Sequence, residues 1–321
     1  MKKGLIVAAR YLTLAAILLF GVWYVSENYE KFASGARFTA GNISLLIGLC
    51  MLTLLFESIR MKFQVRKLGY NLSLLDAWHI FTVLQATNHI VLKAGTFSAG
   101  YYMSKKYRIS FHAYCAFVIT YVVIMVLASG VFGLGVSIVY ILMGTGTTSM
   151  LPLFFIAIIV SCAAFISLAA VQIPVSRLPH FMQRVVKAWR EIYSDYNLIL
   201  TMVVIEIFYF LTCSLRFLVA VSMFSTDMTF LNAVVVVTVG NFLRIASIVP
   251  GGLGIAEVAS GWTAAVVGND AGISGLSAGL DRLIYVTLLM VFGGVGFLTL
   301  SGRSEFHKPK EDEEMDEFAA G

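Results

Sequence analysis

Ionisable side chains within apolar segments are the residues of this sequence that could do chemistry. Charges at membrane depth are costly, so such residues are by default candidates for binding or transport. A cation there could bind a phosphate, and an acid could carry a proton. Within or beside the apolar segments, the sequence places Asp76, His79, His89, Lys93, Glu206, Arg216, Arg244, Glu257, Asp281 and Arg282.

Two of these cations lie beside predicted breaks in helices. Lys93 follows an apolar turn in I-V-L-K-A-G at 90–95, and Arg244 precedes the stretch S-I-V-P-G-G-L-G-I-A-E at 247–257. In a helix interior, Pro costs about 3 kcal/mol and Gly about 1 kcal/mol. The exposed N–H groups where a helix restarts can donate to an anion. The pattern therefore predicts a phosphate site made by the two cations and the turn glycines Gly251, Gly252 and Gly254.

The acidic residue Glu257 lies in the first turn of the helix expected after these glycines. If it faces a cavity, it is the candidate proton carrier. An acid also suits the positive end of a helix, so a capping role is an equal alternative. Structural ion pairs, of Arg244 with Glu257 or of Lys93 with Asp76, are further alternatives.

Three other charges are secondary candidates for the same site. Asp281 and Arg282 fall near the outer end of the last predicted span, where they could simply mark the interface. Arg216 lies ten residues after Glu206 on one predicted helix. Residues at that spacing are too far apart to pair directly, so each could contact another span.

The composition places the chain among helical membrane proteins. Hydrophobic residues make up 59% of the sequence and charged residues 13%, with mean hydropathy +0.86. Soluble domains are about half apolar and a quarter charged. No Walker loop, H-E-x-x-H or G-x-S-x-G motif occurs, so we expect neither enzyme activity nor a cofactor. His79 and His89 lie ten residues apart with no cysteine nearby, so we expect no metal site.

Apolar runs and basic loops together predict an all-α protein with six full spans and both termini in the cytoplasm. Cytoplasmic loops retain Lys and Arg, which also explains the pI of 9.0 without a nucleic-acid partner. The full spans are predicted at 8–26, 38–58, 111–143, 150–173, 196–224 and 275–300. The orientation rests on Lys2, Lys3, Arg10, Arg60, Lys62, Arg66, Lys67, Lys105, Lys106, Arg108, Arg177, Arg184, Lys187, Arg190, Arg303, Lys308 and Lys310.

Two further apolar segments must each enter and leave the membrane on one side in this topology. They are predicted as re-entrant helical hairpins at 73–104 and 229–268, entering from opposite faces. Broken helices at that depth need surrounding protein or a water-filled cavity. Residues 1–143 and 150–300 then each hold three crossings and one hairpin. This is an inverted-topology repeat of the kind found in secondary transporters.

Three smaller segments complete the predicted organisation. The 111–143 run would be about 50 Å long at 1.5 Å per residue, and we expect one tilted helix, with the glycines at 130–135 as the place for a break. Two short spans are the alternative. The stretch 174–195 is predicted as an amphipathic helix on anionic lipid or, equally, as a basic cytoplasmic linker. The tail 301–321 is acidic, and we expect it to be cytoplasmic and disordered.

One stretch resembles the hallmark of a known family. N-F-L-R-I-A-S-I-V-P-G-G-L-G-I-A-E at 241–257 is similar to the lysylphosphatidylglycerol synthase transmembrane family, also called flippase-like membrane proteins. Chain length and span pattern match over nearly all of 1–300. The family's first-half pattern, roughly N-x-x-x-P-x-x-G-E, is partly kept in N-H-I-V-L-K-A-G-T at 88–96, with Leu92 for the proline and Thr96 for the acid. The resemblance adds Asn88 and Asn241 to the predicted substrate-binding residues.

The resemblance implies lipid translocation rather than lipid synthesis. The family forms the membrane half of the multiple peptide resistance factor, whose aminoacyl-transferase domain does not follow here. We therefore expect a flippase-like protein of a prokaryotic inner membrane that moves an anionic phospholipid or a polyprenyl-phosphate-linked glycan. The alternatives are an accessory subunit partnering a lipid-modifying enzyme or glycosyltransferase, or a carrier for a small anionic solute.

Overall fold

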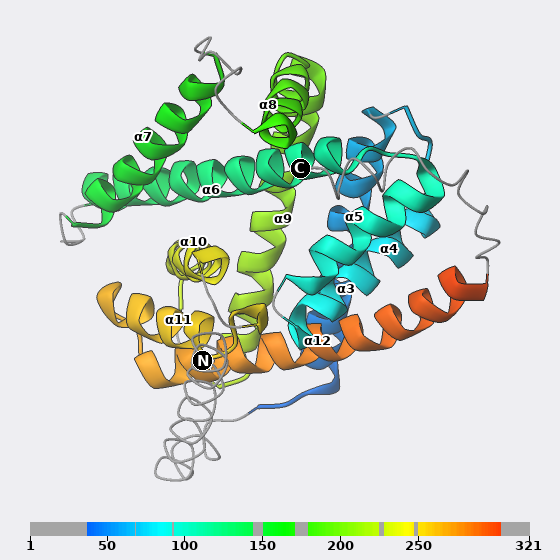
Figure 1. Cartoon of the computed structure of the whole chain (residues 1–321). Coiled ribbons are helices and arrows are strands. Elements are labelled where there is room, and N and C mark those ends of the chain that lie inside the picture. Colours follow the sequence, from blue (N-terminus) through cyan, green and yellow to red (C-terminus); the bar gives the residue numbers. More distant parts are fainter. Residues whose placement is uncertain are drawn as a thin grey trace, which may run out of the picture.

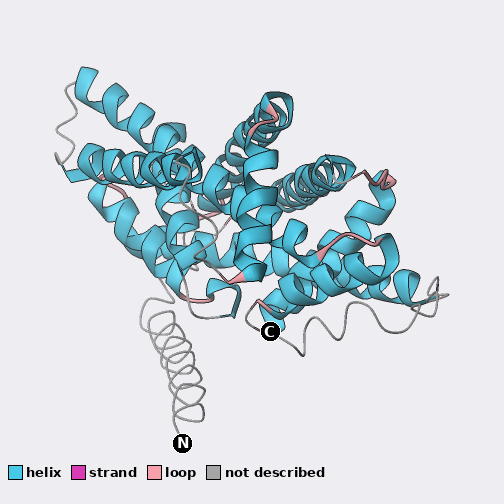
Figure 2. Ribbon diagram, turned by 45° about the horizontal axis from the view of Figure 1, so that its top comes forward, coloured by secondary structure: helices cyan, strands magenta, loops and turns pink. Residues whose placement is uncertain are grey.

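The computed structural model describes residues 37–67, 69–91, 93–143, 150–170, 179–224, 228–246 and 250–302. These residues form ten α-helices and one short 3₁₀ turn, without a strand among them (Figure 1, Figure 2). The elements are α3 (Ala40–Lys67), α4 (Leu74–Ile90), α5 (Ala94–Tyr107), α6 (Phe111–Leu142), α7 (Met150–Ala170), α8 (His180–Tyr193), α9 (Tyr196–Ser222), α10 (Phe230–Ala246), η2 (Pro250–Gly252), α11 (Ile255–Val266) and α12 (Ala271–Gly302).

Four helices of the described residues are long and apolar enough to cross a membrane, namely α3, α6, α9 and α12. They coincide with four of the six predicted full spans. The predicted span 150–173 corresponds to α7, whose apolar part Leu151–Ser167 is shorter. The predicted first span at 8–26 and nearly all of the acidic tail lie outside the described residues.

Helix α3 continues past residue 58, where we predicted its span to end. Arg60, which we assigned to a cytoplasmic loop, is therefore inside the helix and only 4% exposed. The prediction of a loop position for Arg60 was wrong. In the sequence, a cation that follows an apolar run looks like a loop residue, but in the fold the carboxylates of Glu57 and Glu206 neutralise its charge and allow burial. Arg66 and Lys67 occupy the last turn, where cations suit the negative helix end.

The long run at 111–143 forms the single helix α6, with no break at its glycines. These glycines make room for α7 instead. A Cβ on Gly130 would lie 2.9 Å from the Ile159 side chain, and one on Gly133 would overlap the ring of Phe155. Small residues let neighbouring membrane helices approach closely while their backbone hydrogen bonds stay intact.

Each predicted hairpin is a pair of short helices. Helices α4 and α5 have 17 and 14 residues, and α10 and α11 have 17 and 12. At 1.5 Å per residue, the longest of them is about 26 Å, shorter than the roughly 30 Å hydrocarbon core of a bilayer. Each member is thus shorter than that core, and re-entry stays a prediction. Their depth in the membrane stays a prediction.

The first helix pair docks on α12 through small residues. A Cβ on Gly293 would lie 2.7 Å from the Ala86 Cβ, and one on Gly296 would lie 3.0 Å from the His79 carbonyl oxygen. In the view of Figure 1, α4 and α5 lie on one side of α9, and α10 and α11 lie on the other. The two pairs therefore approach the centre of the molecule from opposite sides.

The basic stretch before α9 contains the amphipathic helix α8. Val185, Trp189 and Ile192 are buried, and they pack with Phe117 of α6 and Met202 of α9. Protein thus covers the middle and the end of the apolar face that we considered for insertion into lipid, while Phe181 at its start is 42% exposed. The cations of the other face line a surface pocket with His180 and Gln183, namely Arg184, Lys187 and Arg190.

Candidate functional site

The turn of the first helix pair is held by an amide clamp. Lys93, the N-cap of α5, adopts left-handed backbone angles (φ 56°, ψ 5°) and gives no side-chain cap to the helix. Asn88 of α4 supplies one instead: its Oδ1 accepts from the Thr96 N–H at 3.1 Å, and its Nδ2 donates to the Thr96 Oγ1 at 3.1 Å. One of the free N–H groups of the α5 N-terminus is thereby satisfied.

The turn of the second pair is built from glycines that an arginine binds. Gly251, Gly252 and Gly254 have φ of 60°, 67° and 80°, angles that residues with a Cβ rarely adopt. Arg282 of α12 donates to the carbonyl oxygens of Gly251 and, at 3.0 Å, of Gly252. The same guanidinium binds the Glu257 carboxylate at 2.8 Å. Arg282 is therefore a brace for this turn, and Glu257 is half of an ion pair.

The two turns meet at two side chains. A Cβ on Gly251 would lie 2.6 Å from His89 Cδ2, and a Cβ on Gly252 would lie 2.8 Å from Arg244 Cγ. The glycine turn thus lies against α4 on one side and against α10 on the other. Glycine is required here for close approach as well as for its backbone angles.

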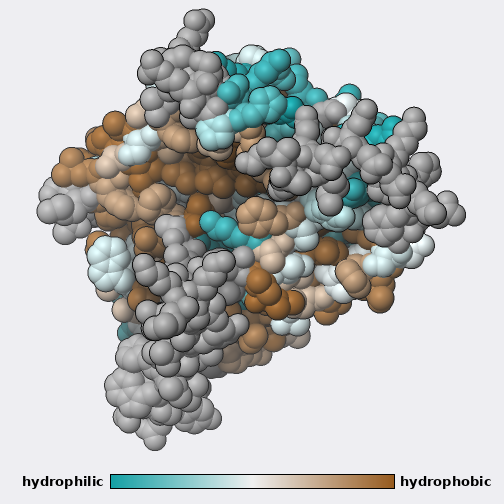
Figure 3. All heavy atoms as spheres, in the orientation of Figure 1, coloured by the Kyte–Doolittle hydropathy of each residue, from teal (hydrophilic) through white to brown (hydrophobic). Residues whose placement is uncertain are grey.

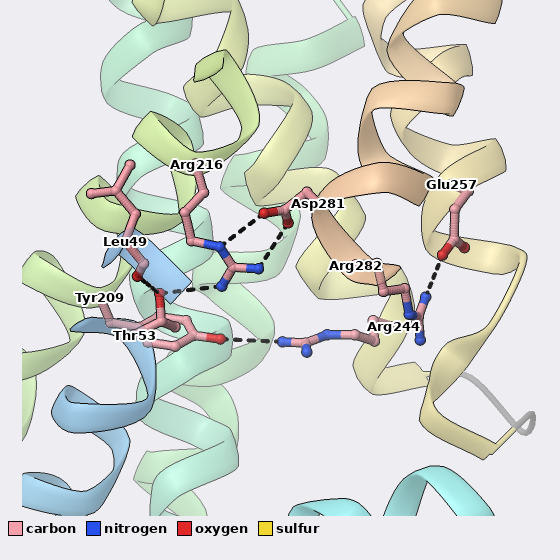
Figure 4. Close-up of polar contacts among 8 residues, drawn as sticks. All are labelled: Leu49, Thr53, Tyr209, Arg216, Arg244, Glu257, Asp281 and Arg282. Carbon is pink, nitrogen blue, oxygen red and sulfur yellow. Dashed lines mark hydrogen bonds and ion pairs between the residues drawn. The ribbon is translucent and has the colours of Figure 1, made fainter. Parts of the chain in front are cut away.

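A second arginine, Arg216, is also paired with a carboxylate. Arg216 of α9 makes a bidentate ion pair with Asp281 of α12, with both N–O distances 2.9 Å (Figure 4). It also donates to Thr53 Oγ1 at 3.2 Å and lies 4.7 Å from the ring centroid of Tyr285. Bidentate guanidinium–carboxylate contacts are strong and directional. This pair joins α9 to α12, and the position of Asp281 relative to the membrane interface stays a prediction.

Arg244 lies between these two ion pairs without an acid of its own. Its Nη2 donates to the Tyr209 hydroxyl at 3.4 Å, and no described carboxylate lies within ion-pair distance. Figure 4 shows its side chain extended toward Tyr209, with Arg216 and Arg282 each bound to a carboxylate nearby. The expected alternative, an Arg244–Glu257 pair, does not occur. Arg244 is therefore a cation available to an anionic ligand.

Two neighbouring cavities share this arginine. The larger, about 370 Å³, extends between α3, α4, α6 and the glycine turn, and the smaller, about 100 Å³, lies between α9, α10, α11 and α12. His89 and Arg244 line both cavities. Figure 3 shows a hollow with hydrophilic side chains between apolar walls near the middle of the view. The polar residues that line the larger cavity include Glu57, Arg60, Gln64, Gln85, Asn88, Lys93, Thr96 and Tyr121.

Nearly all of the predicted site residues are brought together at these cavities. The larger is lined by Asn88, Lys93, Arg244, Gly251 and Gly252, and the smaller by Asn241, Arg244, Glu257, Arg216, Asp281 and Arg282. Gly254, the N-cap of α11, lines neither cavity. The Asn241 Nδ2 is buried and has no hydrogen-bond partner among the described residues. Lys93 is exposed and is not paired with Asp76, whose side chain binds Ser73.

Sequence reasoning missed the acidic end of the larger cavity. Glu57 and Arg60 of α3 line it, and Arg60 binds Glu206 of α9 at 2.8 Å. Tyr121 of α6 lies under the Arg60 guanidinium, 3.7 Å from ring centroid to Cζ. The i,i+3 spacing of Glu57 and Arg60 was the available signal, because it fits a helix that continues past residue 58.

Comparison with known protein families gives a match, which extends over most of the chain. A family model described as the lysylphosphatidylglycerol synthase TM region matches residues 6–293. The chain belongs to this family. Comparisons with curated proteins and with solved structures give no match.

Membership in the lysylphosphatidylglycerol synthase transmembrane family confirms the resemblance drawn from 241–257. The match includes both turns, three of the long helices and α12 as far as residue 293. Thr96, which stands where the family's first-half pattern has an acid, is the partner of Asn88 in this member. A threonine suits this position because its backbone N–H donates to Asn88 Oδ1 and its hydroxyl accepts from Asn88 Nδ2.

Proposed function

We propose that this protein is a flippase-like translocator that binds an anionic lipid headgroup in the larger cavity and moves it across the cytoplasmic membrane. The observation that carries the proposal is the state of Arg244. It is the cavity cation whose nearest described partner is a phenol, while Arg216 and Arg282 are bound to carboxylates. A phosphate would supply the missing counter-charge through charge-assisted hydrogen bonds.

The surroundings of Arg244 suit a phosphate with apolar tails. Asn241 offers a buried amide donor in the adjoining smaller cavity, and Lys93 adds a second cation at the opposite turn of the larger one. The volume of about 370 Å³ falls within the range of ligand cavities. Apolar side chains of α6 complete the wall, among them Phe117, Val118 and Val122. This mixture fits a lipid better than a small solute that must be fully enclosed by polar groups.

The proposed membrane arrangement follows from the short helix pairs. Both would be re-entrant, from opposite faces, within an inverted repeat of 1–143 and 150–300, with both termini cytoplasmic. The second helix of each pair begins at a residue with positive φ, Lys93 in one and Gly254 in the other. This shared turn geometry supports the repeat. Broken helices that meet around a cavity are the usual place for substrate in such repeats.

The function can be tested by following fluorescent phosphatidylglycerol in proteoliposomes with a membrane-impermeant quencher. Wild-type protein should accelerate exchange between leaflets, and Arg244→Ala should slow it about tenfold or more, the effect of losing about 1.4 kcal/mol of headgroup binding. Lys187→Ala, which removes an exposed cation of α8, is the matched control and should leave the rate unchanged.

The same assay separates the alternatives. No acceleration for any anionic lipid would contradict a translocator and favour an accessory subunit or a carrier for a small solute. Equal rates for wild type and Arg244→Ala would contradict the proposed site. Phosphatidylcholine serves as the zwitterionic control, and we expect it to exchange more slowly.

A further inference from the structure

Two buried carboxylates share one guanidinium at the acidic end of the larger cavity. Arg60 Nη1 binds Glu206 Oε2 at 2.8 Å, and Arg60 Nη2 is in an ion pair with Glu57. All three are buried: Arg60 is 4% exposed, Glu206 0% and Glu57 3%. Glu206 Oε1 is buried and has no hydrogen-bond partner among the described residues. We call Glu57, Arg60 and Glu206 the acidic triad.

The acidic triad carries a net negative charge, which Arg244 offsets together with Lys93 at the same cavity. Tyr121 stacks on Arg60, but its hydroxyl donates to Met125 Sδ at 3.1 Å. Arg244 donates to the Tyr209 hydroxyl of α9, one helical turn after Glu206. The ionisable groups that line the larger cavity beside Glu57 and Arg60 are His89 of α4, Lys93 at the start of α5, Tyr114 and Tyr121 of α6 and Arg244 of α10. Those that line the adjoining smaller cavity include Tyr209 and Cys213 of α9 and Tyr285 of α12.

Binding of an anion at Arg244 upsets this balance. The positive charge of Arg244 would then be taken by the phosphate, which leaves two carboxylates facing the single guanidinium of Arg60. An uncompensated charge in a buried site is costly, and a carboxylate in that position takes up a proton instead. Glu57 and Arg60 line the same cavity as Arg244, so the pair and the proposed anion site share one cavity.

We propose that the acidic triad is a proton-binding site coupled to the headgroup site at Arg244, so that the Glu57–Glu206 pair binds one proton as the anion binds. The inference rests on the proposed function, since it needs an anionic ligand at Arg244. The proton comes from a hydronium ion of the solvent: one of its O–H bonds breaks, an O–H bond forms on a carboxylate oxygen, and water is left. By linkage, the proton and the anion strengthen each other's binding by the same factor.

This assignment differs from the sequence-based candidate for proton transfer. Glu257 is in a one-to-one pair with Arg282 beside the glycine turn, so its charge is already compensated. In the acidic triad, by contrast, two carboxylates share one guanidinium, so one negative charge is uncompensated once an anion is bound to Arg244. A lipid carrying one negative charge would move together with one proton, and a proton gradient would drive the step.

The test is proton uptake on binding of dihexanoyl phosphatidylglycerol to the purified full chain in weakly buffered detergent, read with a pH dye. We expect about one proton per bound headgroup at neutral pH, the value for a pair of acids that titrates as a unit. Glu206→Gln should bind the lipid without uptake. Asp195→Asn, at the one-to-one pair with Lys67, is the matched control and should keep uptake unchanged.

An infrared measurement on the wild type removes dependence on variants that fail to fold. A protonated-carboxyl band should appear when the lipid is added. Binding without uptake and without this band would overturn the proton site and leave the translocator intact. Uptake and the band without any lipid exchange in proteoliposomes would support the proton site and overturn translocation. Absence of lipid binding would overturn both.

Discussion

Arg282 binds Glu257 at 2.8 Å and holds the carbonyl oxygens of Gly251 and Gly252 with the same guanidinium. One side chain of the last long helix thus fixes the turn between α10 and the returning helix α11. Because this turn also lies against His89 and Arg244, its position determines the shape of both cavities.

Loss of this brace should destabilise the protein. We expect Arg282→Ala to cost about 2–4 kcal/mol, because it leaves a largely buried carboxylate and two turn carbonyls without their donor. Thermal unfolding in detergent should show a clearly lower Tm. Glu257→Gln keeps an acceptor for Arg282 and should have a smaller effect. An unchanged Tm for Arg282→Ala would contradict the role of Arg282 as a brace.

A methyl group on the glycine turn should impair function beyond its effect on stability. Gly252→Ala forces a positive φ on alanine, at a cost of about 1–2 kcal/mol, and also pushes on Arg244. Gly268 has φ 80° with nothing within 4 Å of an added Cβ, so Gly268→Ala is the matched control. Both variants should lose similar stability, but Gly252→Ala alone should lose lipid exchange. Equal exchange rates would show that the contact with Arg244 is unimportant.

The amide clamp of the first helix pair should protect the start of α5. Asn88→Ala removes two hydrogen bonds to Thr96 and should cost about 1–2 kcal/mol, as for other lost helix caps. Hydrogen exchange of residues 94–100 should become faster. Asn88→Asp keeps the acceptor for the Thr96 N–H, and its second carboxylate oxygen can accept from the Thr96 hydroxyl, so it should restore protection. Unchanged exchange in Asn88→Ala would mean that Lys93 and its turn hold the helix without the clamp.

The pair between Lys67 and Asp195, the N-cap of α9, should make the stability of the start of this helix depend on pH. The hydrogen bond from Lys67, followed by that from the Leu198 N–H, lowers the pKa of Asp195. A lowered folded-state pKa means that the contribution is present above the unfolded value, about 3.9, and is lost as pH falls through the folded value. The Tm difference between wild type and Asp195→Asn should therefore be small at neutral pH and vanish in acid. A difference that grew in acid would have the wrong sign.

The breaks and the long helices could be predicted from the sequence because their causes are local. Pro250 and its neighbouring glycines exclude a continuous helix, and uninterrupted apolar runs require one in lipid. The meeting of Lys93 and Arg244 at one cavity was also predictable in outline, since each cation lies beside a break. These inferences use residues within a few positions of one another.

The pairing of charges could not be predicted because it depends on helix packing. Arg216 and Asp281 are 65 residues apart, and Arg60 and Glu206 are 146 apart. Nothing near Arg60 in the sequence names Glu206 as its partner, so Arg60 resembled a loop cation. Which arginine stays without an acid is likewise decided only when α9, α10 and α12 come together.

The central claim is that Arg244 receives the negative charge of a lipid headgroup. The most direct measurement is the Kd of dihexanoyl phosphatidylglycerol and dihexanoyl phosphatidylcholine for wild type and Arg244→Ala by calorimetry in detergent. We expect phosphatidylglycerol to bind wild type at least about tenfold more tightly than the variant, with phosphatidylcholine binding both weakly and alike. Equal Kd values of phosphatidylglycerol for wild type and Arg244→Ala would contradict the claim.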